Sequence, residues 1–311
     1  MPTAAAAHHP SRRRAYLSLA LGVFGIAWSA ILVRWAGTSG LVSAFYRLAF
    51  ASIVFFPWSR GATHHHAGFT REARRAAIVA GVAFAADLAF FNSAVMMTSA
   101  ANAALLGVNA PIFVALGAWI MYGERPTARF WTGFVLALTG LVSIVGTDVL
   151  LHPTLGVGDL LAVLGALCYG IYLLFVQRSR TSIDAVTFSL WSAAIGAACL
   201  VPVCLLAGKP LVGFSGRTWA SLIALALVSQ VMGQMLVAHA MGRLPATLSS
   251  IVLLAQAPMT ALLAWPLLGE RIRAAQIVGG ALVLAGIFVV NATRFAPSGA
   301  LQRLRQGRST S

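Results

Sequence analysis

Two ionisable side chains, Arg47 and Asp87, interrupt long apolar stretches of a chain of 311 residues. Only 9% of the residues are charged and only 7 are acidic, so a charge inside such a stretch is unusual. At the middle of a membrane helix an Arg or Asp costs about 2.5 to 3.5 kcal/mol unless it is paired or hydrated. We expect Asp87 to face a polar interior and Arg47 to pair with it or to bind a ligand carboxylate. The alternative for Arg47 is a side chain that extends to the membrane surface.

Other polar and aromatic side chains occur in similar surroundings. Gln230 and Gln234 are one helical turn apart and would share one face of a helix, where they contact a ligand or bond to other helices. Trp28 and Tyr169 each precede a small residue within an apolar stretch and could form aromatic walls. The candidate binding residues are Arg47, Asp87, Asn92, Gln234, His239, Trp28 and Tyr169.

The composition indicates a membrane protein. Hydrophobic residues make up 59% of the chain and the mean hydropathy is +0.85, whereas about a quarter of the residues in soluble proteins are charged. Apolar runs of about 20 residues, the length that crosses a bilayer as a helix, recur along the sequence. Outer-membrane strands would instead alternate polar and apolar residues over about 10 positions. Ten helical spans are predicted, over residues 16–35, 40–58, 76–98, 100–122, 128–147, 158–177, 184–206, 218–241, 245–268 and 273–292.

The distribution of basic residues predicts the orientation. Most of the 22 Lys and Arg residues lie in the two tails or in loops that would share their side of the membrane. Because cytoplasmic loops carry the excess of basic residues, both termini are expected in the cytoplasm, at an inner (plasma) membrane. A nucleic-acid partner is not expected in spite of the net charge of +15, since the basic residues are spread over loops rather than gathered on one face.

A motif that occurs twice indicates an internal repeat. Each copy has an Ala-Pro pair, a Gly-Glu-Arg turn and two glycines seven residues apart. The copies are Ala110-Pro111, Gly123-Glu124-Arg125, Gly133 and Gly140, and Ala257-Pro258, Gly269-Glu270-Arg271, Gly279 and Gly286. Each half holds five spans, an odd number, so the second half must enter the membrane from the opposite side. We expect Pro111 and Pro258 to kink their helices and the glycines to allow close helix contact.

The same register pairs polar residues within the apolar spans. Asp87 aligns with Gln234, Asn92 with His239, Asn102 with Ser249, and Asn109 with Gln256. Arg47 aligns with Ser189, so any role of Arg47 is not duplicated. The predicted organisation is a cytoplasmic tail over residues 1–15, repeats over 16–147 and 158–293, and a basic cytoplasmic tail over 294–311.

No motif for a metal, a cofactor or ATP is found. Cys168, Cys199 and Cys204 lie in apolar spans without ligand spacing, and the cluster His64-His65-His66 fits a solvated loop better than a metal site. Gly156-Val157-Gly158-Asp159 matches the Gly-x-Gly-Asp motif of intramembrane aspartyl proteases, but Asp87 lacks the Tyr that should precede the second aspartate. An N-cap at the start of a helix explains Asp159 more simply.

The chain resembles the EamA-type members of the drug/metabolite transporter (DMT) superfamily over about residues 16–293. The doubled Ala-Pro and Gly-Glu-Arg motifs carry the resemblance, together with Phe45-Tyr46-Arg47-Leu48 and Gly158-Asp159-Leu160-Leu161. The resemblance implies an all-α membrane protein of ten transmembrane helices, arranged as two five-helix inverted-topology repeats around a central cavity. It also implies movement of small organic molecules, such as amino acids, nucleosides or cationic drugs, often outward.

We therefore expect a secondary active transporter that exports amino acids or related small metabolites as its two halves rock around the cavity. The nearest alternative is multidrug efflux of lipophilic cations, which Asp87 would attract and Arg47 would oppose. The protease is a distant alternative, and a static membrane scaffold or receptor would have no use for the repeat. The expected partners are a small-molecule substrate, the lipid bilayer and a proton as candidate coupling ion, in a monomer or homodimer without cofactor or metal.

Overall fold

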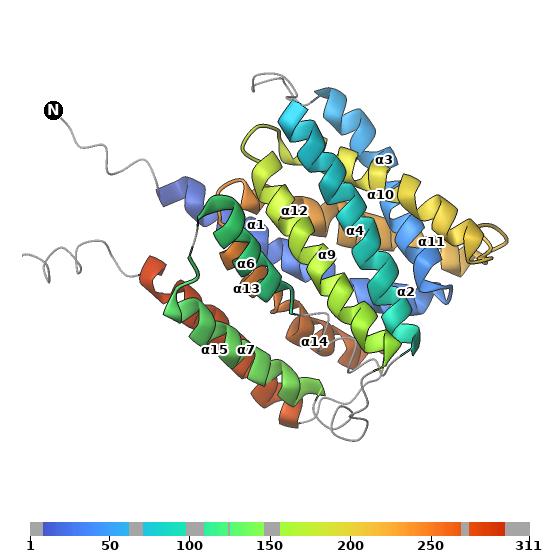
Figure 1. Ribbon diagram of the computed structural model, residues 1–311. Coiled ribbons are helices and arrows are strands. Elements are labelled where there is room, and N and C mark those ends of the chain that lie inside the picture. The colour runs from blue at the N-terminus through green and yellow to red at the C-terminus, as the bar shows by residue number, and fades with distance from the viewer. Residues whose placement is uncertain are drawn as a thin grey trace, which may run out of the picture.

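The computed structural model describes residues 9–61, 71–97, 109–123, 125–145, 156–268 and 274–295. This part of the chain is helical and contains no strand, which confirms the predicted all-α class (Figure 1). Its helices are α1 (His9–Ala27), α2 (Ser29–Ala36), α3 (Gly40–Gly61), α4 (Arg71–Met97), α6 (Ala110–Tyr122), α7 (Ala128–Val145), α9 (Val157–Ser179), α10 (Ala185–Leu206), α11 (Gly216–Ala224), the π-helix η1 (Leu225–Gln234), α12 (Met235–Met241), α13 (Ala246–Leu253), α14 (Gln256–Leu268) and α15 (Ala274–Phe295).

Six helical segments of the described ranges are long and apolar enough to cross a membrane. They are Arg13–Ala36, Gly40–Arg60, Leu160–Ser179, Ala185–Leu206, Gly216–Met241 and Ala246–Leu267. These segments coincide with predicted spans one, two, six, seven, eight and nine. Helices α4 and α7 lie at predicted spans three and five, while α6 and the stretch Ile277–Val290 of α15 are shorter apolar helices at spans four and ten. The chain therefore has several membrane-capable helices, in the order that the hydropathy predicts.

Two of the long spans contain breaks. In span one, α1 ends at Ala27 and α2 begins at Ser29, with Trp28 between them. In span nine, α13 ends one turn before Pro258, which has no N–H to donate to the carbonyl of Leu254. That carbonyl instead accepts a hydrogen bond from the backbone N–H of Ala257 at 3.2 Å. Span nine is thus interrupted between α13 and α14, and Pro258 is the third residue of α14.

Pro111 has a place similar to that of its repeat partner. It is the second residue of α6, with Asn109 as the N-cap residue, and Pro258 is the third residue of α14, so both prolines lie in a first helical turn. Proline is well tolerated there because the N–H groups of the first turn have no intrahelical acceptor. The kink expected at Pro111 in span four stays a prediction. The upstream part of that span, including Asn102, lies outside the described residues.

Helices α7 and α15 pack against each other along the four repeated glycines (Figure 1). A Cβ placed on Gly133 would lie 2.6 Å from the carbonyl oxygen of Gly286, and one on Gly140 would lie 2.8 Å from the backbone nitrogen of Val283 and close to the carbonyl of Gly279. The early glycine of α7 thus meets the late glycine of α15 and the reverse, so the two helices are antiparallel. The predicted close contact at these glycines is confirmed.

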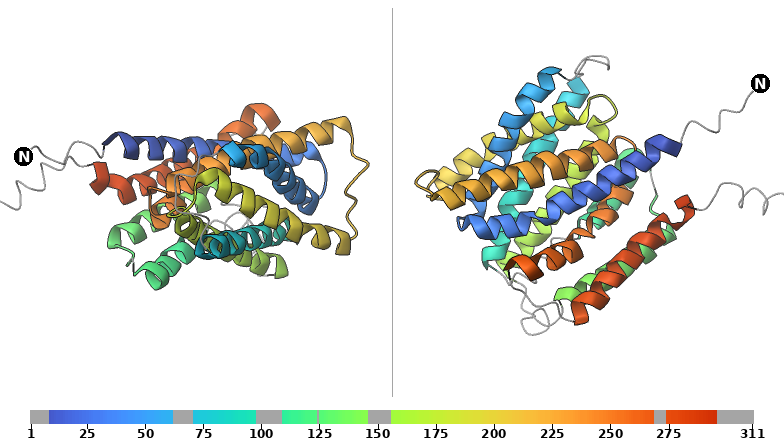
Figure 2. Two further views of the ribbon diagram at one scale, coloured as in Figure 1. Left: turned by 90° about the horizontal axis from the view of Figure 1, so that it is seen from above. Right: turned by 180° about the vertical axis from the view of Figure 1, so that it is seen from behind.

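The remaining helices also pack across the two halves of the sequence. Helix α4 contacts α9 and α10, and α1 lies along η1 and α12 (Figure 2). Glycines permit this approach: a Cβ on Gly25 of α1 would lie 3.0 Å from the Cα of Gly233 in η1. Side chains of both halves consequently face one another in the interior, which is where the candidate residues lie.

The connection between α6 and α7 shows how the first Gly-Glu-Arg turn works locally. Gly123 ends α6 with a φ of +68°, a left-handed conformation that favours glycine, and its N–H bonds to the carbonyl of Trp119 at 3.0 Å. The Thr127 hydroxyl accepts the N–H of Phe130 at 3.2 Å and caps α7. Glu124 itself lies outside the described residues, as do the second turn over residues 269–273, the cluster His64-His65-His66 and the tails over residues 1–8 and 296–311.

Candidate functional site: a buried polar cluster around Arg47

Arg47 points into the helix bundle rather than toward the membrane surface. Its side chain is only 6% exposed. The Nε atom donates to Gln230 Oε1 at 2.9 Å, and Nη1 donates to Ser29 Oγ at 3.1 Å. The guanidinium carbon also lies 5.7 Å from the ring centroid of Phe84. Snorkelling is therefore excluded for Arg47 in this conformation, since three other helical segments hold its head group inside the protein.

The charge of Arg47 is not neutralised by these contacts. Gln230 and Ser29 are dipoles that accept hydrogen bonds but carry no charge, and a buried cation without an anionic partner is costly. Asp87 of α4 is close enough to interact electrostatically with Arg47. No ion pair or hydrogen bond joins these two side chains directly within the described ranges. An anion beside Arg47 would therefore meet a positive charge, and a cation beside Asp87 would meet a negative one.

Asp87 is half-buried in α4, opposite a glycine of α9. A Cβ placed on Gly165 would lie 3.5 Å from Asp87 Oδ1. A larger side chain at Gly165 would thus press on the carboxylate. Glycine at this position lets α9 pack closely against α4 beside Asp87.

Aromatic rings line one side of the cluster. Phe84 stacks on Tyr172 with ring centroids 4.5 Å apart, and Tyr172 stacks on Tyr169 at 5.8 Å. Phe84 and Tyr172 are almost fully buried, whereas Tyr169 is half-buried and interacts electrostatically with both Arg47 and Asp87. The predicted placement of Tyr169 in an aromatic wall near the two charges agrees with this geometry.

The amide of Gln234 has one buried oxygen without a protein partner among the described residues. The side chain is 3% exposed, lies beside Tyr169, and its Oε1 atom accepts no hydrogen bond from any described residue. Leaving a buried acceptor unsatisfied costs about 1 to 3 kcal/mol, so such a group usually meets water or a ligand. Gln230 and Gln234 both face the interior, as their spacing predicts.

Irregular backbone surrounds the same region. Both glutamines lie on η1, and π-helical segments occur frequently at functional sites. Near the break in span one, Ser229 donates to the carbonyl of Gly25 at 3.1 Å and Thr260 donates to that of Ala27 at 2.9 Å. These bonds satisfy carbonyls that the interrupted helix would otherwise leave unpaired. Trp28 occupies the break itself, directly before Ser29.

The structure does not bring every candidate to this cluster. His239 lies on α12 next to Arg243, with His239 Nε2 and Arg243 Nη1 separated by 3.2 Å, and it interacts electrostatically with Arg180 instead of Arg47. Asn92 lies on α4, but its side chain is outside the described part. Arg47, Asp87, Gln234 and Tyr169 are brought together, and Trp28 adjoins them through Ser29.

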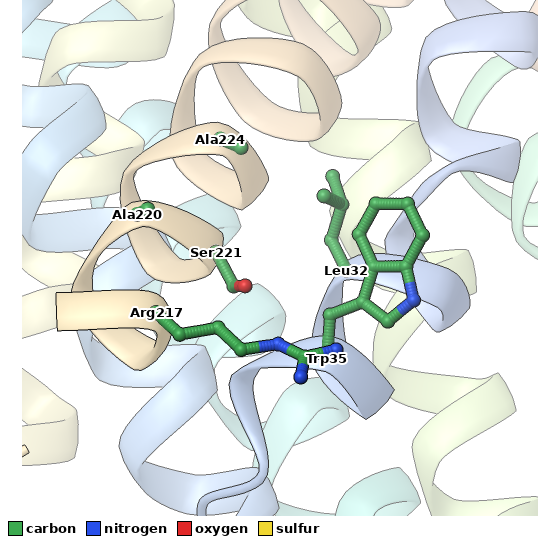
Figure 3. Close-up of a pocket in the computed structure, with 6 residues that line it drawn as sticks. All are labelled: Leu32, Trp35, Arg217, Ala220, Ser221 and Ala224. Atoms are coloured by element: carbon green, nitrogen blue, oxygen red, sulfur yellow. The ribbon is translucent and has the colours of Figure 1, made fainter. Parts of the chain in front are cut away.

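Two hollows lie at opposite ends of span eight, on either side of the cluster. The first, of about 410 Å³, lies between α2 and α11, where Arg217 extends toward Trp35 beside Ser221 (Figure 3). The second, of about 350 Å³, includes Arg180 and His239. Gln230 and Gln234 lie between the residues of the two hollows along span eight.

Sequence reasoning placed Gln230 and Ser29 close to the candidates but did not identify them as partners of Arg47. Phe84 was missed entirely. Its position one helical turn before Asp87 could have indicated that both share a face of α4. The hydrogen bonds of Arg47 depend on the contact of α3 with η1, which no local pattern reveals.

The comparisons with known proteins agree with the architecture. The model of the EamA-like transporter family matches residues 13–146 and again residues 156–292. One relative, an uncharacterized transporter of Archaeoglobus fulgidus, is 25% identical over 80% of this chain and 86% of its own length. Another, a probable terminal-alkyne amino-acid exporter of Streptantibioticus cattleyicolor, is 25% identical over 62% of this chain and 64% of its own. A solved crystal structure matches with a TM-score of 0.77 at 18% identity, over 92% of this chain and 100% of the other, which shows a shared fold.

Proposed function

Because this chain belongs to the EamA-like transporter family, we propose that it is a secondary active transporter that exports amino acids or related small metabolites. The observation that carries the proposal is the placement of Arg47 and Asp87 in one interior region without a direct ion pair among the described residues. A zwitterionic amino acid has the complementary pattern: its carboxylate would meet the Arg47 guanidinium and its ammonium group would meet Asp87. The relative named as a probable amino-acid exporter supports the same substrate class.

The neutral groups of the cluster would hold the remainder of such a substrate. Gln234 Oε1, which lacks a partner in the described part of the protein, would accept a hydrogen bond from the substrate ammonium group. The rings of Phe84, Tyr169 and Tyr172 would contact its side chain. Aromatic faces also attract cations, so they would add to the effect of Asp87 on the ammonium group.

For the transport step we propose ten transmembrane helices in two inverted repeats that rock against each other around the cluster. The antiparallel contact of α7 with α15, in which Gly133 meets Gly286 and Gly140 approaches Gly279, supports a two-fold relation between the halves. The two matches of one family model, one in each half, support it as well. Broken helices next to the substrate site are common in transporters of this construction.

The proposed location is the inner membrane, with both termini in the cytoplasm, a proton as coupling ion and a monomer or homodimer as the working unit. Single cysteines introduced at Arg125 and Arg271 test the inversion. The first should react with a membrane-impermeant thiol reagent only from the cytoplasmic side and the second only from the outside. Labelling of both positions from the same side would contradict the inverted repeat.

A second candidate function is efflux of lipophilic cations. The carboxylate of Asp87 beside the stacked rings of Phe84, Tyr169 and Tyr172 favours it, because aromatic walls with one anion suit such ligands. The buried charge of Arg47 opposes it. The transporters among the relatives support transport over the intramembrane protease considered from the sequence.

Efflux assays in a transporter-deficient host distinguish the two. The host expressing this protein is loaded with a panel of amino acids and, separately, of lipophilic cations, with and without a proton gradient. We expect outward movement of one or more amino acids that stops when the gradient is collapsed. Movement of the cations alone would favour multidrug efflux.

A further inference from the structure

The second hollow, at the end of span eight, is lined by both basic and apolar side chains. Its volume is about 350 Å³, and residues of α1, α10 and α12 line it. Arg180, His239 and Arg243 are its basic residues, while Val186 and Leu236 provide apolar surface. A pocket of this composition suits an amphiphile with an anionic head better than a purely apolar molecule.

Arg180 is held in place by backbone carbonyls, and Arg243 contacts a side chain. Arg180 Nε donates to the carbonyl of Ala238 at 3.0 Å, and its Nη1 donates to the carbonyl of Ile183. Arg180 Nη2 lies toward Gly242, where a Cβ would approach it to 3.0 Å. Arg243 is exposed and reaches His239. Two arginines from different turns therefore line one hollow, and the guanidinium group of Arg180 is fixed by its two carbonyl bonds.

The local charge is not balanced. Asp184 is the acidic side chain that lines the hollow, and its carboxylate is used to cap α10 by accepting the N–H of Thr187 at 2.9 Å. Burial lowers the pKa of Arg180, Asp184 opposes this shift, and the like charge of Arg243 adds to it. Within the described ranges, no ion pair joins either arginine to Asp184. An anion with several oxygens would compensate the excess positive charge.

The position along the helices matches the head-group layer of a bilayer. Arg180 directly follows the membrane-capable segment that ends at Ser179, Asp184 directly precedes the one that begins at Ala185, and Arg243 follows the one that ends at Met241. Basic pockets between transmembrane helices at this depth bind lipid head groups. The exposed Leu17 and Leu21 of α1, at 60% and 48%, are on the same helix as Ser18 of the hollow and offer surface for acyl chains.

We propose that this hollow binds a phosphate group, with Arg180 and Arg243 as its ligands and His239 as a further donor. The proposal goes beyond the transported substrate, because the site lies apart from Arg47 and Asp87. The same phosphate chemistry is available from an anionic phospholipid and from soluble phosphate. Either source would join α1 of the first half to α10 and α12 of the second, and so would favour the conformation in which these helices are close.

The test uses the purified full-length protein in detergent and measures binding of phosphatidylglycerol by native mass spectrometry, with inorganic phosphate as competitor. The variant Arg243→Gln removes an exposed charge and should not impair folding, whereas Arg180 also bonds two carbonyls and is left intact. Arg178→Gln is the matched control, since Arg178 is an exposed arginine at the end of α9 that does not line the hollow. We expect Arg243→Gln to weaken binding about fivefold and Arg178→Gln to leave it unchanged.

Each outcome decides the proposal. Loss of binding in Arg243→Gln without competition by phosphate identifies the lipid as the source, and competition by phosphate identifies the soluble ion. If Arg243→Gln binds as well as Arg178→Gln, the proposed site is wrong. It is also wrong if the unchanged protein binds neither phosphatidylglycerol nor inorganic phosphate. Because binding is measured without transport, this result is independent of whether amino acids are the exported substrates.

Discussion

The two halves of the chain share a pattern of helices but differ in the charge that they place in the interior. In the first half, α3 carries Arg47 and α4 carries Asp87. The aligned positions of the second half hold Ser189 and Gln234, which are neutral and buried. Among the described residues, one side-chain hydrogen bond joins Arg47 to the second half, and its acceptor is Gln230.

This difference separates two roles. The repeated features, such as the glycines between α7 and α15, concern how helices approach one another. The unrepeated features, Arg47 and Asp87, are the residues that we propose bind the substrate. Because the interior charges of the cluster lie in only one half, the site is not symmetric. A zwitterion would bind there in one orientation. The variants below alter the charged half first and the shared scaffold last.

The largest effect is expected from Asp87→Ala. The substitution removes the anion of the charged half and leaves Arg47 without its electrostatic partner, so efflux should fall by about 100-fold. Efflux of a preloaded amino acid is measured together with the amount of protein in the membrane. Glu72→Ala, on an exposed position of the same helix, should behave as the unchanged protein. Normal efflux by Asp87→Ala would remove Asp87 from the site.

Exchanging the aligned residues Asp87 and Gln234 tests whether the two halves are equivalent at these positions. In the double variant Asp87→Gln with Gln234→Asp, the carboxylate moves to the second half while Arg47 stays in the first. We expect efflux to remain below about a tenth of normal, because Ser189 supplies no second arginine to complete the site on the other side. Recovery to the normal rate would mean that the two halves are interchangeable at these positions.

The shape of the Arg47 head group should matter as well as its charge. Arg47→Lys keeps a cation, but a single ammonium group cannot reproduce the planar fork that bonds to Gln230 and Ser29 while facing a carboxylate. Substrate affinity should fall by about tenfold in a binding assay. Arg60→Lys, at an exposed position of the same helix, is the control. Unchanged affinity in Arg47→Lys would argue for a purely electrostatic role.

A smaller effect is expected in the shared scaffold. Gly286→Ala places a Cβ 2.8 Å from the backbone nitrogen of Ala137 and close to the carbonyl of Gly133, so α7 and α15 must separate. Such overpacking costs about 1 to 3 kcal/mol and should appear as a lower unfolding temperature in detergent. At Gly216 a Cβ would meet no other atom within 4 Å, so Gly216→Ala should leave that temperature unchanged. Equal temperatures for both variants would contradict the close contact.

Much of the fold follows from the sequence because lipid imposes strong constraints. Apolar length predicts the membrane-capable helices, and the duplicated glycines predict a close helix contact, since both signals are local. That the two glycine faces meet each other, in the contact of α7 with α15, was not predicted, because it depends on the packing of distant segments. The break at Trp28 and the π-helix η1 carry no such signal. They depend on hydrogen bonds from Ser229 and Thr260 to carbonyls of another helix.

Part of the site could be predicted because lipid also constrains where charged residues occur. A charge inside an apolar stretch identifies Arg47 and Asp87 from composition alone. Alignment of the repeat also suggested His239, but the end of α12 places it beside Arg243, at the boundary of the span. Depth along a helix could have indicated this, because His239 is two residues from the end of its span whereas Gln234 is seven.

Transport of substrate analogues by the purified protein in liposomes tests whether Arg47 and Asp87 bind the two charged ends of the substrate. An amino acid that is exported in cells is compared with its methyl ester, which lacks the carboxylate, and with its N-acetyl derivative, which lacks the ammonium group. If Arg47 and Asp87 bind the two ends of a zwitterion, both analogues should be transported at least about tenfold less well than the parent. Transport of the ester at or above the rate of the amino acid would contradict the proposal and would favour a carrier of cations.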